Sequence, residues 1–286
     1  MISGRYMNSV EIKMSERLIT IADMLSRAGK YLPEYEGKQL RTADVGCDHG
    51  YISIYLAEKD ISSSCIAMDV RKGPLSGALA NIREHGLEER IATRLSDGLK
   101  ELKKGEADSV VIAGMGGDLM KRIITDADVA ELGIKIGVLQ PQSELCEFRA
   151  FLRESGFYIA EEKIVYEDGK YYFPMLVIFL GDRAISDDHN GKKDPESACC
   201  SSFLDKVVER LCDKGGVTKE DALNICNAYG EHNILSSNPL LKKYLLHGKK
   251  VSESIVKNLD ADTHAGRLAE LNRELFYIDT ILKVAF

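Results

Sequence analysis

The residues best suited to chemistry begin at the end of the first apolar run, in the segment DVGCDHG. Gly46 and Gly50 permit a tight turn and let a ligand approach the backbone closely. Asp48 stands where a dinucleotide-binding turn would carry its second glycine, and its carboxylate would repel a pyrophosphate. The turn therefore favours a cationic or zwitterionic ligand. S-adenosylmethionine fits this description, because it has a sulfonium and an ammonium group and no phosphate.

Acidic residues also follow the next two apolar runs. Asp69 lies roughly 20 residues after Gly46, where an acid can accept hydrogen bonds from both ribose hydroxyls. Asp97, in a Ser-Asp-Gly segment, could accept the adenine amino group. The ordinary alternatives are a helix N-terminal acid before Pro74 for Asp69 and a common Asp-Gly turn for Asp97. We favour the ligand roles.

Two later segments suit a flat ring. AGMGG (113–117) ends the fourth apolar run, and its glycines leave room beside a reacting atom. LQPQ (139–142) ends the fifth, and its amide side chains offer paired donors and acceptors for an adenine edge. The alternatives are a plain loop for the glycines and a helix-start residue after Pro141 for Gln142. The ligand interpretation gains support because residues of types that can bind a ligand follow each of five successive apolar runs.

Several of these segments resemble the TrmK family of bacterial tRNA methyltransferases. The matching stretches are ADVGCDHGYISIYL, AMDVRKGPLSGA, SDGL, AGMGGDLM and LQPQ. The family methylates N1 of adenosine 22 in tRNA with S-adenosylmethionine, and has a class I methyltransferase domain followed by a helical coiled-coil domain. The resemblance covers residues 15–181 and, more loosely, 230–286. Cys47, Ile52-Ser53 and Gln142 depart from the family pattern, and Gln142 could alter how the target base is held.

The resemblance also implies which residues line the site. The cofactor would contact Asp44, Gly46, Asp48, His49, Asp69, Asp97 and Gly114. The target adenine would face Met115, Gly116, Gly117, Gln140, Pro141 and Gln142. His49 has an equal alternative as a loop residue that hydrogen-bonds the turn.

The elements that must position these residues alternate along the chain. Nearly continuous apolar runs predict strands at 42–46, 63–70, 91–97, 108–116 and 134–141. Amphipathic segments predict helices at 15–30, 51–59, 74–86, 117–125 and 142–155. We therefore predict a doubly wound α/β sheet of the class I methyltransferase, Rossmann-like type.

A different pattern follows this alternation. The apolar runs 157–166 and 170–180 are joined by Glu167-Asp168-Gly169, and Asp-Gly is a strong hairpin signal. A parallel sheet that ends in an antiparallel hairpin is typical of S-adenosylmethionine-dependent methyltransferases. Nicotinamide-binding domains usually end on another parallel strand, so an NAD-dependent oxidoreductase is disfavoured.

The last third of the chain is predicted to be helical. Residues 181–198 are polar and predict a linker, and 196–230 predict one or two short helices. A coiled-coil seam follows the positions Leu268, Leu271, Leu275, Ile278, Leu282 and Ala285. A weaker seam follows Leu241, Tyr244, Val251 and Ile255, with Gly248 at the missing position. With a turn at Asp260-Ala261-Asp262, these seams predict an antiparallel helical hairpin. We divide the chain into a methyltransferase domain (1–181) and a helical domain (182–286).

Composition bounds the class of protein. The 286 residues are 44% hydrophobic, which is typical of a globular chain, and carry a formal charge of −7. No apolar run approaches the ~20 residues that would cross a bilayer, and charges interrupt the N-terminus where a signal peptide would be apolar. The seven cysteines contain no Cys-x-x-Cys pair, which favours reduced thiols over a metal site. We expect a cytoplasmic protein without a metal, and a monomer.

An acidic protein can still bind tRNA through a local basic face. Candidates near the sheet are Arg5, Arg17, Arg27, Lys30, Arg71 and Lys72. Candidates on the first helix of the hairpin are Lys242, Lys243, Lys249 and Lys250. A solvated helix face is the ordinary alternative. Two other functions remain open: methylation of a small molecule or protein, and a non-catalytic adaptor that uses the coiled coil.

Overall fold

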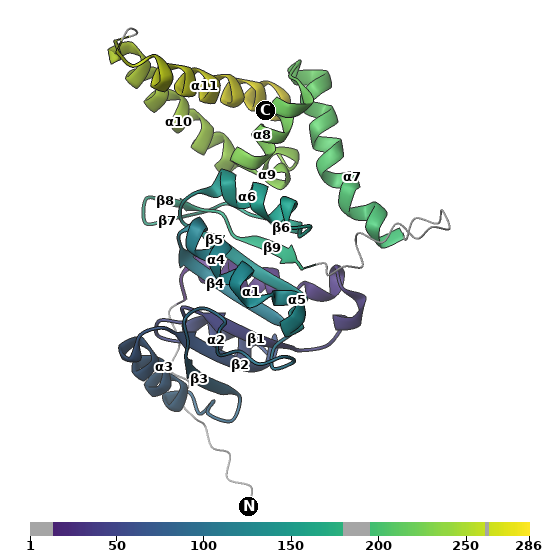
Figure 1. Ribbon diagram of the computed structural model, residues 1–286, viewed down its shortest axis with the longest axis vertical. Coiled ribbons are helices and arrows are strands. Elements are labelled where there is room, and N and C mark those ends of the chain that lie inside the picture. The colour runs from purple at the N-terminus through teal and green to yellow at the C-terminus, as the bar shows by residue number, and fades with distance from the viewer. Residues whose placement is uncertain (1–13, 180–194, 261–262) are drawn as a thin grey trace, which may run out of the picture.

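The computed structural model describes residues 14–179, 195–260 and 263–286, and its centre is a mixed seven-stranded sheet (Figure 1). The strand order is β3-β2-β1-β4-β5-β9-β6. The parallel strands are β1 (Leu40–Val45), β2 (Ser62–Asp69), β3 (Ile91–Leu95), β4 (Ser109–Met115) and β5 (Ile136–Pro141). β9 (Met175–Ile178) runs antiparallel to β5 and to β6 (Tyr158–Glu162). The predicted class I methyltransferase fold is confirmed.

Helices cover both faces of the sheet. One face carries α1 (Glu16–Leu25), α2 (Tyr51–Glu58) and α3 (Lys72–Glu84). The other carries α4 (Gly117–Ala127), α5 (Val129–Leu132) and α6 (Leu145–Glu154). Successive strand side chains point to opposite faces. Val110 and Ile112 therefore join the core with α4 and α6, while Val111 between them joins the core with α1 and α2.

Two predicted helices differ at their ends. Ser15 caps α1 as its side chain accepts the N–H of Leu18 at 3.3 Å, but the helix ends at Leu25, before 3₁₀ turns at Ala28–Lys30 and Pro33–Tyr35. The helix predicted over 142–155 begins only at Leu145. The residues before it form a loop, in which Glu144 has a positive φ of 50°.

The predicted long hairpin is divided into two strand pairs. β6 and β9 belong to the main sheet, whereas β7 (Val165–Glu167) and β8 (Lys170–Tyr172) form a separate two-stranded sheet. The prediction of two continuous strands was wrong because the pairing breaks near Pro174, which has no N–H to donate. The predicted turn is present: Asp168 and Gly169 have φ of 49° and 78°, as a two-residue type I′ turn requires.

Beyond the sheet, the described chain is helical. Its helices are α7 (Pro195–Arg210), a π-helical turn (Leu211–Gly215), α8 (Lys219–Tyr229), α9 (Glu231–Leu235), α10 (Pro239–Asn258) and α11 (Ala265–Ala285). α10 and α11 form the predicted antiparallel hairpin (Figure 1). Most of the predicted linker 181–198, the turn residues Ala261 and Asp262, and Arg5 lie outside the described residues. From Pro195 onward the predicted linker is helix instead.

The weaker seam on α10 is only partly buried: Leu241 is buried as predicted, whereas Tyr244, Val251 and Ile255 border the space between α10 and α11. The buried positions of this helix are Leu241, Leu245 and Ser252, whereas Val251 and Ile255 are 44% and 37% exposed. The seam on α11 is closer to the prediction, with Leu271 and Ile278 buried. α10 also contacts α8, where the Tyr229 and Tyr244 rings lie with their centroids 6.4 Å apart.

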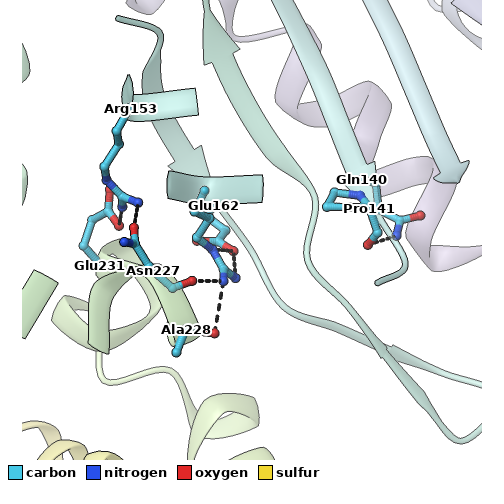
Figure 2. A network of polar contacts seen from close by, with 8 residues as sticks. Gln140, Pro141, Arg153, Glu162, Asn227, Ala228 and Glu231 are labelled. Atoms are coloured by element: carbon cyan, nitrogen blue, oxygen red, sulfur yellow. Dashed lines mark hydrogen bonds and ion pairs between the residues drawn. The ribbon is translucent and has the colours of Figure 1, made fainter. Parts of the chain in front are cut away.

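The helical region is joined to the sheet through a buried ion pair. Arg149 of α6 binds Glu162 of β6, with Nη2 2.5 Å from Oε1, and neither side chain is exposed. Nη1 of Arg149 donates to the carbonyls of Asn227 and Ala228, at 2.7 and 3.0 Å, near the end of α8. Arg153 binds Asn227 beside this pair (Figure 2). One hydrophobic core also runs from the sheet into α8, α10 and α11, so the two predicted domains share their packing.

Candidate active site

A cavity of about 480 Å³ lies at the carboxyl ends of β1, β2 and β4. It is centred where the strand order reverses between β1 and β4, the usual ligand position in an open α/β sheet. The predicted residues that line it are Asp44, Gly46, Asp48, His49, Asp69, Asp97, Gly114, Met115 and Gln142. The structure thus brings together residues from five strand ends.

Two glycines shape the cavity at positions whose positive φ disfavours other residues. Gly46 has a φ of 74°, and a Cβ added there would lie 2.3 Å from Cε of Met115. Gly114 has a φ of 80°, and a Cβ there would lie 3.7 Å from both Nη1 of Arg17 and Nε2 of Gln142. The absence of side chains at these two positions keeps the space between the turn and β4 open.

Asp44 is the most strongly perturbed carboxyl group of the cavity. The Ser53 hydroxyl donates to its Oδ2 at 2.6 Å, and within the described residues no cation pairs with it. Burial raises the pKa of Asp44 to about 7, and the nearby charge of Asp69 adds to the effect. A buried carboxylate without a positive partner can bind a ligand cation strongly.

Two further acids of the cavity, Asp69 and Asp97, differ in their partners. Asp69 is nearly buried, and its Oδ1 accepts the N–H of Arg71 at 2.8 Å. Asp97 is exposed, and its ion pair with Lys100 at 2.5 Å holds the pKa of Asp97 below its usual value. Asp69 is therefore fixed in place, while Asp97 would have to exchange Lys100 for a ligand.

Asp48 and His49 lie at the open side of the turn. Asp48 has a φ of 50° and a side chain that is 68% exposed. The His49 ring stacks on Tyr51, with ring centroids 5.6 Å apart, and its Nε2 lies 3.8 Å from Asp48. The carbonyl of His49 also accepts a hydrogen bond from Asn81, so this residue lines the cavity and supports the loop as well.

Gly116 and Gly117 do not line the cavity. They begin α4 and pack against the loop after β5, where a Cβ on Gly117 would lie 2.8 Å from the carbonyl oxygen of Ser143. Oε2 of Glu144 accepts the N–H of Gly117 at 2.9 Å and satisfies the first turn of α4. The absence of side chains at these glycines lets Ser143 and Glu144 pack against the start of α4.

Gln140 and Pro141 are also absent from the lining. The Gln140 side chain is completely buried, and its Nε2 donates to the Pro141 carbonyl at 2.9 Å (Figure 2). Its Oε1 accepts a hydrogen bond from Nη1 of Arg17 at 2.8 Å. Gln140 can therefore act on a ligand only through Arg17.

Arg17 is the cavity residue that the sequence did not place there. It lines the cavity from α1, between the Gln140 amide and the Tyr172 ring, whose centroid is 5.3 Å from its Cζ. In the sequence, the position of Arg17 off the apolar stripe of α1 indicates only that its side chain is not part of the core on that stripe. The cavity thus combines several carboxylates with two guanidinium groups, of which Arg17 is oriented by Gln140 and Arg71 lies beside Asp69, an arrangement suited to a zwitterion.

Comparisons with known proteins agree with this geometry. The family described as "Methyltransferase domain" matches residues 14–175. The tRNA (adenine(22)-N(1))-methyltransferase of Bacillus subtilis (strain 168) is 36% identical over 173 residues, which is 60% of this chain and 68% of that protein. A putative tRNA methyltransferase of Mycoplasma genitalium is 31% identical over 58% of this chain and 69% of its own length.

Solved structures extend the likeness to the helical region. The crystal structure of the B. subtilis m1A22 tRNA methyltransferase TrmK has a TM-score of 0.70 at 25% identity, and covers 95% of this chain and 100% of that one. A Streptococcus pneumoniae protein, solved in complex with S-adenosyl-L-methionine, has a TM-score of 0.68 at 24% identity, over 94% and 99% of the two chains. Among the described residues, no helix is long and apolar enough to span a membrane, and no cluster of His, Cys, Asp or Glu could hold a metal ion.

Proposed function

The chain belongs to the TrmK family of S-adenosylmethionine-dependent methyltransferases, and we propose that it methylates N1 of adenosine 22 in tRNA. One observation carries the proposal from the structure: a carboxylate without a cationic partner, Asp44, lies in a cavity at the switch point of a class I methyltransferase sheet. The B. subtilis relative supports the choice of substrate.

The residues of the cavity fit S-adenosylmethionine. Asp44 and Asp48 offer negative charge to the ammonium and sulfonium groups, and Arg17 offers a cation to the carboxylate. Asp69 would accept from the ribose hydroxyls and Asp97 from the adenine amino group. The cavity contains no cluster of cations that would favour a pyrophosphate. When bound, S-adenosylmethionine supplies the methyl group.

The reaction makes modest demands on the protein. Adenine N1 has an available lone pair and no proton at neutral pH, so the chemical step requires no general base. The protein must hold N1 in line with the methyl group and stabilise the positive charge that develops on the base. We assign contact with the base to Gln142 and Met115, which line the cavity, and the orientation of Arg17 to Gln140. Gly116, Gly117 and Pro141 lie outside the cavity and support the loop after β5, which carries Gln142.

We also propose a division of labour between residues 1–181, which bind the cofactor, and residues 182–286, which contact the RNA. The structure divides the candidate cations into two groups. Arg27 is paired with Glu161 at 2.7 Å, and Lys249 with Asp279 at 2.5 Å, so both have structural roles. Lys243 and Lys250 are exposed and make no ion pair within the described residues, which suits phosphate contact. We further propose that the protein acts as a monomer in the cytoplasm, where tRNA is found.

Mass spectrometry of digested tRNA tests the proposal. The full chain is incubated with unmodified tRNA and labelled S-adenosylmethionine, and the product is identified at neutral pH, before alkali can rearrange it. We expect one methyl group on N1 of adenosine 22. A methyl group added directly to N6 would contradict the mechanism. Cofactor binding without tRNA methylation would favour a small-molecule or protein substrate, and no cofactor binding would favour an adaptor.

The pH dependence of single turnovers tests the mechanism separately. Because no general base is needed, the rate at saturating cofactor should reach a plateau above neutral pH. A bell-shaped profile would instead require an essential acid-base pair.

A further inference from the structure

A second cavity, of about 320 Å³, lies between α10 and α11. Aromatic and aliphatic side chains line it, including Tyr229, Tyr244, Leu271 and Ile278. Val251 and Ile255 form an exposed apolar edge on α10. We refer to this cavity as the hairpin groove. Its walls have the size and chemistry to hold a flat aromatic ring.

Gly248 keeps the hairpin groove open. Glycine is unfavourable in the interior of a helix, yet Gly248 lies in the middle of α10. A Cβ added there would lie 3.7 Å from Cδ1 of Ile278, which is an ordinary contact distance. The packing of the hairpin therefore does not require glycine at this position. What any larger residue would remove is the space of the groove.

The edge of the groove is basic. His247 lines it, and Lys243 and Lys250 lie on the same side of α10, one turn before and after His247. Both lysines are exposed and have no ion-pair partner among the described residues. Two charged side chains line the groove itself: Glu274 accepts a hydrogen bond from Ser252 and keeps its negative charge, and Arg267 pairs with Glu270. The two lysines place positive charge at the edge of the groove.

The hairpin groove is connected to the cofactor cavity through β7 and β8. The Tyr244 ring packs against Tyr171 and Phe173, with ring centroids 5.1 and 5.4 Å apart. Tyr172, between these two residues, lies over Arg17 in the cofactor cavity. Figure 1 shows this strand pair between the sheet and α10. This strand pair therefore packs against both α10 and Arg17 of the cofactor cavity.

We propose that the hairpin groove holds an unstacked base of the same tRNA whose target adenine enters the cofactor cavity. This inference rests on the proposed function. Proteins recognise unpaired nucleotides by stacking bases on aromatic side chains and by placing cations beside the backbone. Tyr244 supplies the aromatic surface, Gly248 the space, and Lys243 and Lys250 the cations.

Filling the groove tests the proposal. Gly248→Leu in the full chain should weaken tRNA binding about fivefold or more, the lower range for loss of one stacked base, and leave the dissociation constant for S-adenosylmethionine unchanged. Gly266→Leu is the matched control, because a Cβ at Gly266 meets nothing within 4 Å and the residue lies on the same hairpin. Thermal melts of both variants confirm folding. Wild-type tRNA affinity in a folded Gly248→Leu protein would overturn the proposal.

A photoreactive residue identifies the occupant directly. p-Benzoylphenylalanine in place of Val251 should cross-link to one nucleotide of tRNA, and in place of Phe276, an exposed residue that does not line the groove, it should not. Equal cross-linking at both positions, or none at Val251, would overturn the proposal. Both measurements use tRNA binding and not methyl transfer. A wild-type protein that binds tRNA through the groove but methylates another nucleotide would refute the proposed function alone.

Discussion

Asp44 and Glu162 are both completely buried carboxylates on strands of one sheet, and they differ in what surrounds them. Burial raises the pKa of each. Glu162 is opposed in this by Arg149, which binds it with Nε and Nη2. Asp44 has hydrogen bonds from the hydroxyl and the backbone of Ser53. Among the described residues, one carboxylate has a cationic partner and the other has none.

The difference separates a structural site from a binding site. The pair of Glu162 and Arg149 is complete, and it joins the sheet to α8. Asp44 lacks such a cationic partner among the described residues, and it lines a cavity large enough for a ligand. Burial of a carboxylate therefore does not indicate function unless the missing partner must come from outside.

The largest effect should follow from breaking the complete pair. Arg149→Met leaves Glu162 buried without a cation and should lower the free energy of unfolding by about 3–5 kcal/mol, measured by urea denaturation. The double variant Arg149→Met/Glu162→Leu should recover part of this loss, because it removes the unpaired charge. The carbonyls of Asn227 and Ala228 still lose their donor. A single variant as stable as the wild type would refute a structural role for the pair.

A smaller effect, on binding, should follow from removing the charge of the incomplete site. Asp44→Asn should weaken S-adenosylmethionine binding by about 1.5–3 kcal/mol, the range for hydrogen bonds to charged groups, with the fold retained. Isothermal titration calorimetry measures this change. Asp48→Asn is the matched control, because Asp48 is 68% exposed and should contribute much less. Equal losses in the two variants would contradict the importance that we give to burial.

The pH dependence of stability sharpens the same comparison. Since the folded protein raises the pKa of Asp44 from 3.8 to about 7, folding favours its protonated form. The stabilisation is full below about pH 4 and is lost as pH rises toward 7, at no more than about 1.4 kcal/mol per pH unit. Urea denaturation of ligand-free wild type and Asp44→Asn should diverge over this interval, in favour of the variant at high pH. Cofactor affinity of the wild type should rise over the same interval. Parallel stability curves would show that Asp44 titrates normally.

The smallest effect should come from the residue that orients Arg17. Gln140→Leu removes the acceptor of one hydrogen bond and should reduce kcat/KM by roughly fivefold, or about 1 kcal/mol. Tyr172→Phe keeps an aromatic ring beside Arg17 and should retain wild-type kinetics. A fully active Gln140→Leu would show that Arg17 needs no help from Gln140.

The sequence predicted the sheet well because local signals define it. Nearly continuous apolar runs end in polar residues, and these polar residues meet at one edge because parallel strands place their carboxyl ends together. Asp44, Asp69 and Gly114 could be placed in this way or by family resemblance. They line the cavity that the structure contains.

The contacts that the sequence did not reveal join distant segments. Arg17 and Gln140 are 123 positions apart, and no periodicity relates them. Arg149 and Glu162 read as surface charges, because charged residues are seldom buried unless paired. Val251 and Ile255 continue a plausible seam, but a helix that packs on two sides offers several seams of similar strength. Tertiary packing decided each of these cases.

The hydrophobic core that runs from β9 through α8 to α10 and α11 has a consequence for how the protein unfolds. Residues such as Phe148 and Leu152 lie under both the sheet and the helices, so neither part can melt without exposing the other. Heating should therefore give one cooperative transition in calorimetry, with equal calorimetric and van't Hoff enthalpies.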